Sequence, residues 1–175
     1  MDDDRYPIGK FIAQQNYSQA ELEKYIKEIE VLPALLSQSI QDLNPTQLDT
    51  PYRDGGWTVR QVVHHLADSH MNAYIRMKWT LTEESPLIKA YDEKAWAETP
   101  ETKADPEISI AFLKALHHKW VVLMRQLSTE NLFLEFIHPE TKKSQRLDKM
   151  IALYAWHGNH HLAHVTHLKK RKGWK

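Results

Sequence analysis

The amino-acid sequence predicts an all-α protein that folds as a four-helix bundle. Four long segments carry apolar residues at helical spacing, and only two short stretches look extended. The chain has 175 residues, of which 42% are hydrophobic and 26% are charged, as in an ordinary globular domain. Four amphipathic helices bury their apolar faces most economically against one another. We therefore expect residues 1–175 to form a single domain.

The first helix is expected over Ser18–Leu43. Ser18 and Glu21 have the spacing of a capping box, and apolar residues then recur every three or four positions. Pro33 lies inside this segment, where its missing N–H and its ring should kink the helix. The pair Asn44-Pro45 should end it.

The second helix should begin after Thr58, which forms a capping box with Gln61, and continue to about Leu81. The next segment, Thr82–Asp105, is charged and contains prolines, with only a short possible helix at Glu93–Ala97. Such a segment is too long for a tight hairpin. It can return the chain to the opposite end of the bundle, so we expect one long crossover that leaves the second and third helices parallel.

The third helix should start at Asp105-Pro106, which combines an N-cap with proline at the first helical position, and run to about Leu127. Two short extended stretches within Asn131–Arg146 predict a small β-hairpin. The fourth helix is expected over Leu147–Arg171. The hairpin would therefore come directly before the last helix.

Composition excludes several classes of partner. Lys plus Arg number 23 and Asp plus Glu number 23, so no overall field favours nucleic acid or membranes. The basic run Lys169–Lys172 falls where the last helix should end, and it is typical of a solvated helix terminus. The acidic N-terminus does not resemble a secretory signal, and no apolar stretch is long enough to span a bilayer. We expect a cytoplasmic protein with no nucleic-acid partner.

Histidines are concentrated in the fourth helix, where five occur between His157 and His167. Residues four apart lie above one another on a helix, so His157 with His161, or His160 with His164, can direct two imidazoles at one ion. A helical wheel places His161 near the centre of the apolar stripe and His157 at its margin. The chain has no cysteine, so any metal must be held by nitrogen and oxygen ligands.

A third ligand must come from elsewhere, since catalytic zinc is commonly held by three protein ligands with one open position. The second helix offers His64, His65, His70 and Asp68. The wheel does not choose among them, because His70 lies near the centre of the buried stripe while His65 and His64 lie on either side. On the third helix, either His117 or His118 can face the same region, although a boundary position is the simpler interpretation.

The segments Gly55–His70, Trp156–His161, Leu48–Asp54 and Tyr91–Trp96 together resemble the YfiT branch of the DinB-like superfamily. The resemblance covers nearly the whole chain. It implies a DinB-type four-helix bundle, commonly a homodimer, with one divalent metal ion per chain. In this sequence the implied ligands are His65, His157 and His161, and His160 with His164 is the competing pair. Zinc is the expected ion, with nickel as the alternative.

The resemblance implies a metal-dependent hydrolase that acts on a small molecule. Relatives that use low-molecular-weight thiols make a bacillithiol-type S-transferase the alternative. A stress-associated protein that holds metal without catalysis is a third hypothesis. Beyond the ligands, the sequence identifies no catalytic residue. Asp68 can accept a proton or be an exposed charge, and His64 and His70 fit structural or supporting roles.

Overall fold

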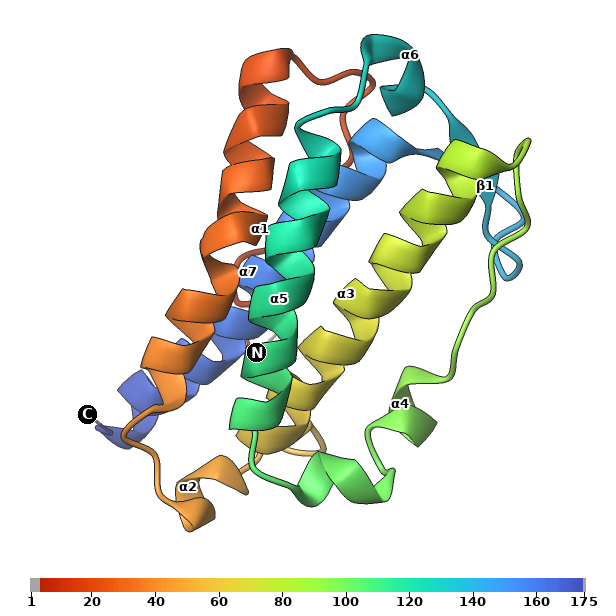
Figure 1. Cartoon of the computed structure of the whole chain (residues 1–175). Helices are drawn as coiled ribbons and strands as arrows, with labels where there is room; N and C mark the ends of the chain where they lie inside the picture. Colours follow the sequence, from red (N-terminus) through yellow and green to blue (C-terminus); the bar gives the residue numbers. More distant parts are fainter. Residues whose placement is uncertain (1–3, 175) are drawn as a thin grey trace.

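The computed structural model of the protein describes residues 4–174 (Figure 1). Four long helices form the bundle that the sequence predicts: α1 (Gln19–Ile40), α3 (Val59–Thr82), α5 (Glu107–Met124) and α7 (Leu147–Lys172). α1 packs against α5 and α7, and α3 packs against the same two helices. None of the described helices has the length and apolar character needed to cross a bilayer.

The predicted crossover is confirmed. In Figure 1, α3 and α5 run in the same direction, and the chain between them returns along the outside of the bundle. This crossover, residues 83–106, contains the expected short helix α4 (Glu93–Trp96) and a 3-10 turn, η1 (Pro100–Lys103), that was not predicted. Two further short helices, α2 (Pro45–Leu48) and α6 (Thr129–Leu132), were also not predicted.

Two helix starts follow the predicted caps. Ser18 with Glu21 and Thr58 with Gln61 both form complete capping boxes. α5 begins at Glu107 with Pro106 at the N-cap position, one residue later than predicted, while the side chain of Asp105 accepts a hydrogen bond from the backbone N–H of Glu107 at 2.9 Å.

Two helices end earlier than expected. α5 ends at Met124 rather than Leu127, because the chain tightens into a turn in which the N–H of Leu127 donates to the carbonyl of Met124. α1 ends at Ile40 rather than Leu43, where a similar contact joins the N–H of Leu43 to the carbonyl of Ile40. α1 is otherwise continuous past Pro33.

The β-hairpin before the last helix is also confirmed. β1 (Glu135–Ile137) pairs antiparallel with β2 (Ser144–Arg146). The crossover joins this hairpin, because the N–H of Ile137 donates to the carbonyl of Pro86 at 2.9 Å and the N–H of Ile88 donates to the carbonyl of Ile137 at 3.1 Å. The start of the crossover is therefore attached to the hairpin that leads into α7.

The core consists of two apolar layers with histidines between them. One layer includes Ile29, Trp120 and Tyr154, and the other includes Leu36, Leu66 and Val165. The sequence positions of His70, His117 and His157 fall between the two layers on their respective helices. The bundle thus contains a polar layer enclosed by apolar side chains, and such groups must be satisfied by hydrogen bonds or by a metal ion.

α1 and α7 approach closely beside this polar layer. A Cβ atom on Gly158 would lie 2.5 Å from Cδ2 of Leu32, so only glycine fits without movement of the α1 side chain. Gly158 directly follows His157 in the sequence. The close contact therefore fixes how near this part of α7 lies to α1.

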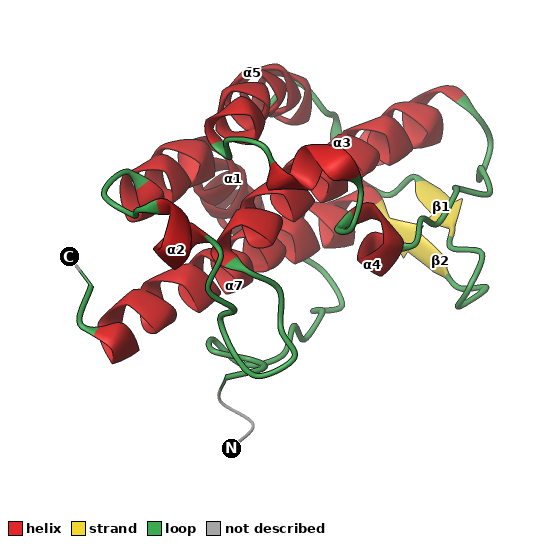
Figure 2. Cartoon of the chain, turned by 90° about the horizontal axis from the view of Figure 1, so that it is seen from below, coloured by secondary structure: helices red, strands yellow, loops and turns green. Residues whose placement is uncertain are grey.

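The N-terminal segment covers the outer side of α7, as the view in Figure 2 shows. The ring of Phe11 lies 5.9 Å from that of Trp156, and the ring of Tyr6 lies 6.0 Å from that of His160. Farther along, the guanidinium of Arg146 donates to the carbonyl of Gln15 at 3.2 Å. This covering segment explains why histidines on the outer side of α7 are removed from solvent.

Candidate metal centre

Three histidines from two helices converge at the polar layer: His65 from α3, and His157 and His161 from α7. We call them the inner triad. One ring nitrogen of each lies within 4.8 Å of the other two. His65 and His161 are buried, His157 is partly buried, and the indole of Trp57 packs at 4.5 Å from the ring of His65. The structure therefore brings together the three residues that the family resemblance implied.

The spacing of the inner triad suits a divalent ion. Nε2 of His65 and Nε2 of His157 are 3.4 Å apart. Two imidazole nitrogens on a tetrahedral zinc, each at about 2.0 to 2.1 Å from the ion, would be separated by about 3.3 Å. In addition, Nδ1 of His161 is buried and has no hydrogen-bond partner among residues 4–174. The donor set and its spacing thus fit a metal ion of this class.

The protonation state of the inner triad also suits metal binding. Burial lowers the pKa of His65 to about 4, and burial lowers the pKa values of His157 and His161 well below the usual range. The neighbouring imidazoles act in the same direction, because each would repel a second positive charge. All three rings are therefore neutral at pH 7, which is the form that ligates a metal.

A second group of histidines lies on the outer side of α7. His160 and His164, which we call the outer pair, form a possible ligand group together with His161. The wheel placed these two residues farther from the apolar stripe, yet both are buried. Tyr52 stacks on His164 at 3.9 Å between ring centres, and Trp156 stacks on His160 at 4.7 Å. Part of this cover, Tyr6 and Tyr52, comes from segments outside the fourth helix, which its periodicity does not report.

The other candidate residues have different surroundings. Nδ1 of His64 lies 2.8 Å from Oγ of Ser109, so His64 links α3 to α5 and has a structural role. His117 is buried while its neighbour His118 is exposed. Asp68 is half-buried and belongs to no group of potential ligands among residues 4–174. Burial, with a contribution from Glu101, raises the pKa of Asp68 to about 6.

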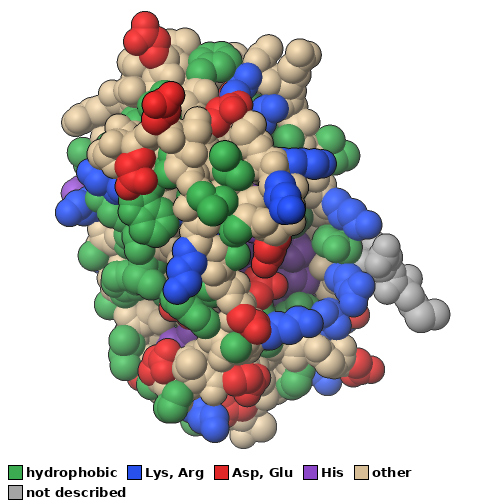
Figure 3. All heavy atoms as spheres, turned by 90° about the vertical axis from the view of Figure 1, so that its right-hand side faces the viewer, with side chains coloured by type: hydrophobic (Ala, Val, Ile, Leu, Met, Phe, Trp, Pro, Cys, Tyr) green, Lys and Arg blue, Asp and Glu red, His purple; other side chains and the backbone are tan. Residues whose placement is uncertain are grey.

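Two cavities open beside the inner triad. One, of about 680 Å³, is bordered by His65, His157 and His161 and by the turn that contains Trp57. The other, of about 610 Å³, is bordered by Arg76, Tyr154 and His157. Glu93 and Lys94 of α4 line both cavities, as does His157. On the face drawn in Figure 3, histidine side chains are visible in an opening between acidic and basic side chains. A small molecule can thus reach the triad.

The second cavity contains an arginine without a carboxylate partner. Arg76 on α3 is 9% exposed and forms no ion pair with any residue that the structure describes. Its guanidinium donates to the hydroxyl of Tyr154 at 3.4 Å and to the carbonyl of Lys89 at 3.2 Å, and its Nε is unpartnered. A nearly buried positive charge without a counter-ion is costly unless a bound anion compensates it.

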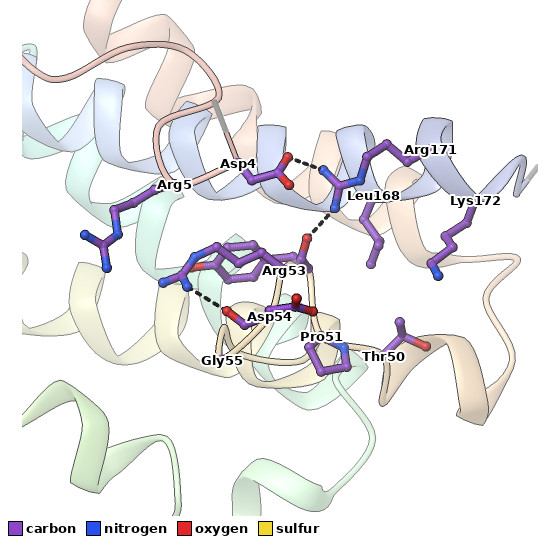
Figure 4. A pocket seen from close by; sticks show the side chains of 11 residues that line it. Asp4, Arg5, Thr50, Pro51, Arg53, Asp54, Gly55, Leu168, Arg171 and Lys172 are labelled. Atoms are coloured by element: carbon purple, nitrogen blue, oxygen red, sulfur yellow. Dashed lines mark hydrogen bonds and ion pairs between the residues drawn. The ribbon is translucent and has the colours of Figure 1, made fainter. Parts of the chain in front are cut away.

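A larger cavity, of about 820 Å³, lies away from the inner triad, between residues 50–55 and the end of α7. Figure 4 shows two of its basic side chains engaged within the protein: Arg171 contacts Asp4 and the carbonyl of Tyr52, and Arg53 donates to the carbonyl of Asp54. Its size alone does not make it the functional site, because it contains no group of metal-ligating side chains.

Comparison with protein families gives one decisive match. The model of the DinB superfamily matches residues 28–165, which include every member of the inner triad. The chain belongs to the DinB superfamily. The family assignment made from the sequence motifs is therefore confirmed.

Several curated relatives are similar over their full length. The protein named "Putative metal-dependent hydrolase YfiT" of Bacillus subtilis (strain 168) is 51% identical over 170 residues, covering 97% of this chain and 96% of the relative. A Bacillus cereus (strain 03BB102) protein with the same designation as a metal-dependent hydrolase is 52% identical over 174 residues, covering 99% and 100% of the two chains.

Solved structures support the fold. The structure of YfiT from Bacillus subtilis, described as having an unusual four-helix bundle topology, superposes with a TM-score of 0.97 at 50% identity and covers 99% of both chains. A mycothiol-dependent maleylpyruvate isomerase superposes with a TM-score of 0.62 at 14% identity, covering 81% of this chain and 59% of that one. The second likeness shows that the same bundle occurs in a distant protein.

Proposed function

We propose that this protein is a metal-dependent hydrolase in which the inner triad holds one divalent ion beside a small-molecule site. The observation that carries the proposal is the meeting of three neutral imidazoles, from two helices, at the wall of an open cavity. The designation of the full-length relatives as metal-dependent hydrolases supports it. Zinc is the ion we expect and nickel is the alternative, since imidazole ligands suit both.

When bound, such an ion supplies positive charge and an open coordination position, and it can lower the pKa of an incoming water toward about 7. The chain's own residues provide the surroundings. His65, His157 and His161 contribute neutral nitrogens only, so they leave the charge of the ion uncompensated. Trp57 packs against the ring of His65, and the open cavity gives a small molecule access to the three rings.

The polar wall of the second cavity defines where the substrate would be held. Arg76 and Lys94 can bind an anionic group, and the hydroxyl of Tyr154 lies beside Arg76 as a further hydrogen-bonding group. We propose that the part of the substrate farthest from the scissile bond is a carboxylate held by Arg76. Glu93, which borders the same cavity, would disfavour a substrate with negative charge close to α4.

Two experiments test the proposed function. Elemental analysis of protein purified without an affinity tag should find one divalent ion per chain, and protein that neither carries nor takes up an ion would overturn the proposal. The metal-loaded protein should then hydrolyse activated carboxylic esters or amides in buffer alone. Turnover that appears only when a small thiol is added would reject hydrolysis in favour of S-transfer, and metal binding without either activity would indicate a non-catalytic protein.

The assembly state is a separate prediction. The family resemblance implies a homodimer, and sedimentation velocity of the metal-loaded protein should give twice the mass of the 20.6 kDa chain. A monomeric mass at micromolar concentration would contradict it.

A further inference from the structure

A line of three imidazoles runs from the inner triad to the backbone of α1. Nδ1 of His157 lies 3.3 Å from Nε2 of His70, and Nδ1 of His70 lies 2.9 Å from Nε2 of His117. Nδ1 of His117 in turn lies 2.6 Å from the carbonyl oxygen of Ile29. His70 and His117 are 0% and 1% exposed, so water does not compete for these contacts.

The end of this line is available because of Pro33. In an α-helix, the carbonyl of residue 29 would accept from the N–H of residue 33. Proline has no N–H, so α1 leaves the carbonyl of Ile29 without its helical donor. The imidazole of His117, which comes from α5, fills that vacancy with its own N–H.

The carbonyl of Ile29 determines the direction of every hydrogen bond in the line. A carbonyl oxygen only accepts, so Nδ1 of His117 must carry a hydrogen. In the neutral ring Nε2 of His117 is then an acceptor, which requires Nδ1 of His70 to donate. By the same reasoning, Nδ1 of His157 donates to Nε2 of His70. Nε2 of His157 is thus left with its lone pair, and this is the atom that faces Nε2 of His65 at 3.4 Å.

We propose that His70 and His117 are positioning residues that hold His157 in the tautomer and orientation needed to ligate a metal through Nε2. The inference rests on the proposed function and deepens it by assigning two residues that touch neither the ion nor the substrate. Metal-ligating histidines generally donate their second ring N–H to an acceptor that fixes their orientation. Here the acceptor is another histidine, and the direction of its own hydrogen bond is set by the carbonyl of Ile29, which has no helical donor because residue 33 is proline.

The line also has an energetic consequence. His70 and His117 are buried and His157 is partly buried, so breaking one link leaves a polar nitrogen or the Ile29 carbonyl without a partner. A set of packing residues would tolerate an apolar replacement of similar size. A set of positioning residues would require the replacement to donate at one end and accept at the other, as a carboxamide can.

The test compares substitutions at two adjacent histidines of α5. His117→Leu removes the contact to Ile29, His117→Gln retains both a donor and an acceptor, and His118→Leu alters an exposed neighbour as the matched control. Zinc affinity is measured by competition with a chromophoric chelator. We expect His117→Leu to weaken affinity by about 10- to 100-fold, His117→Gln to restore most of it, and His118→Leu to change it less than about twofold. Equal affinities for all three variants would overturn the proposal.

A second measurement needs no variant and no metal. Nitrogen-15 NMR of the imidazole rings in the metal-free wild-type protein reports which nitrogen carries the hydrogen. We expect Nδ1–H tautomers for His70, His117 and His157. An Nε2–H tautomer at His70 or His157 would reject the line of hydrogen bonds even if the protein binds zinc, whereas failure to bind any metal would reject the proposed function and leave this result standing.

Discussion

The inner triad and the outer pair consist of the same chemical group on the same helix, but their surroundings differ. The inner triad joins α3 to α7 and borders an open cavity. The outer pair comes from α7 alone and lies beneath Tyr52 and Trp156, and of its two members His160 also borders that cavity. Nε2 of His160 and Nε2 of His164 are 3.0 Å apart, so one nitrogen donates to the other. This contact and the stacking satisfy part of the outer pair, while Nδ1 of His160 has no hydrogen-bond partner among residues 4–174.

The comparison shows that two histidine pairs with the same spacing of four residues on one helix can have different surroundings. The inner triad has a third ring from another helix and a hydrogen-bond acceptor behind His157. The outer pair uses the facing nitrogens in a mutual contact, and its third possible ligand, His161, belongs to the inner triad as well. We therefore expect the two sets to respond differently to substitution and to pH.

The largest expected effect is loss of metal from the inner triad. His65→Ala and His157→Ala should each weaken zinc affinity by at least about 100-fold, because two protein ligands hold zinc poorly. His164→Ala should change it by less than about threefold. Isothermal titration with zinc measures the difference. Equal losses in the inner and outer variants would break the distinction between the two sets.

Acidification should destabilise the metal-free protein. The pKa values of His65 and His117 are lowered from 6.5 to about 4 by burial, so the unfolded chain binds more protons than the folded one between these limits. The free energy of unfolding should therefore fall as the pH is lowered from 6.5 to 4, by up to about 1.4 kcal/mol per pH unit for each histidine. These groups contribute no pH dependence above about pH 7.

Urea unfolding at pH 7, 6 and 5 measures this slope. The pKa of His164 is lowered to about 3, so replacing it by glutamine should make the slope shallower but not abolish it. Stability that is constant from pH 7 to pH 5 would contradict the assignment of neutral, buried rings to the inner triad.

Arg76 should distinguish substrates by charge. Arg76→Gln removes the positive charge from the cavity beside the inner triad while retaining a hydrogen-bond donor. We expect KM for a negatively charged test ester to rise about tenfold, equivalent to about 1.4 kcal/mol, with little change in kcat. A neutral ester of the same shape is the control. An equal change for both esters would mean that Arg76 supports the fold rather than the substrate.

The smallest effect is expected at the outer pair. His160→Gln should lower the free energy of unfolding by about 1 kcal/mol, since it weakens stacking on Trp156 and a hydrogen bond without opening a site. Its zinc affinity should remain close to that of the wild type. If this variant kept its stability but lost its affinity for zinc, the metal site would have to be assigned to the outer pair.

Much of the fold could be predicted because its signals are local. The capping boxes at Ser18 and Thr58 identified two helix starts, and the length of residues 82–105 indicated a crossover. The short helices α2 and α6 were missed although each begins with a capping box, Asn44 with Gln47 and Ser128 with Asn131. One turn of helix is too short to show apolar periodicity, so the cap alone did not indicate them.

The candidate site was predictable only in part. A wheel reports which face of a helix is buried, and it favoured His157 and His161 on α7. It carries no information about contacts between helices, so the choice of His65 depended on the family resemblance and the contact of His70 with His117 was not foreseen. The burial of His160 and His164 was missed for the same reason, because their cover includes Tyr6 and Tyr52, which lie far away in the sequence.

The crossover has a consequence for how this protein can diversify. The three histidines of the inner triad lie on bundle helices, whereas Glu93 and Lys94 on the crossover helix α4 line both cavities beside them. Insertions or exchanges in residues 83–106 would therefore change the shape of these cavities without disturbing the helices that carry the histidines. The same bundle can in this way serve different substrates while its ligand geometry stays constant, and grafting this loop between relatives is a direct route to altered selectivity.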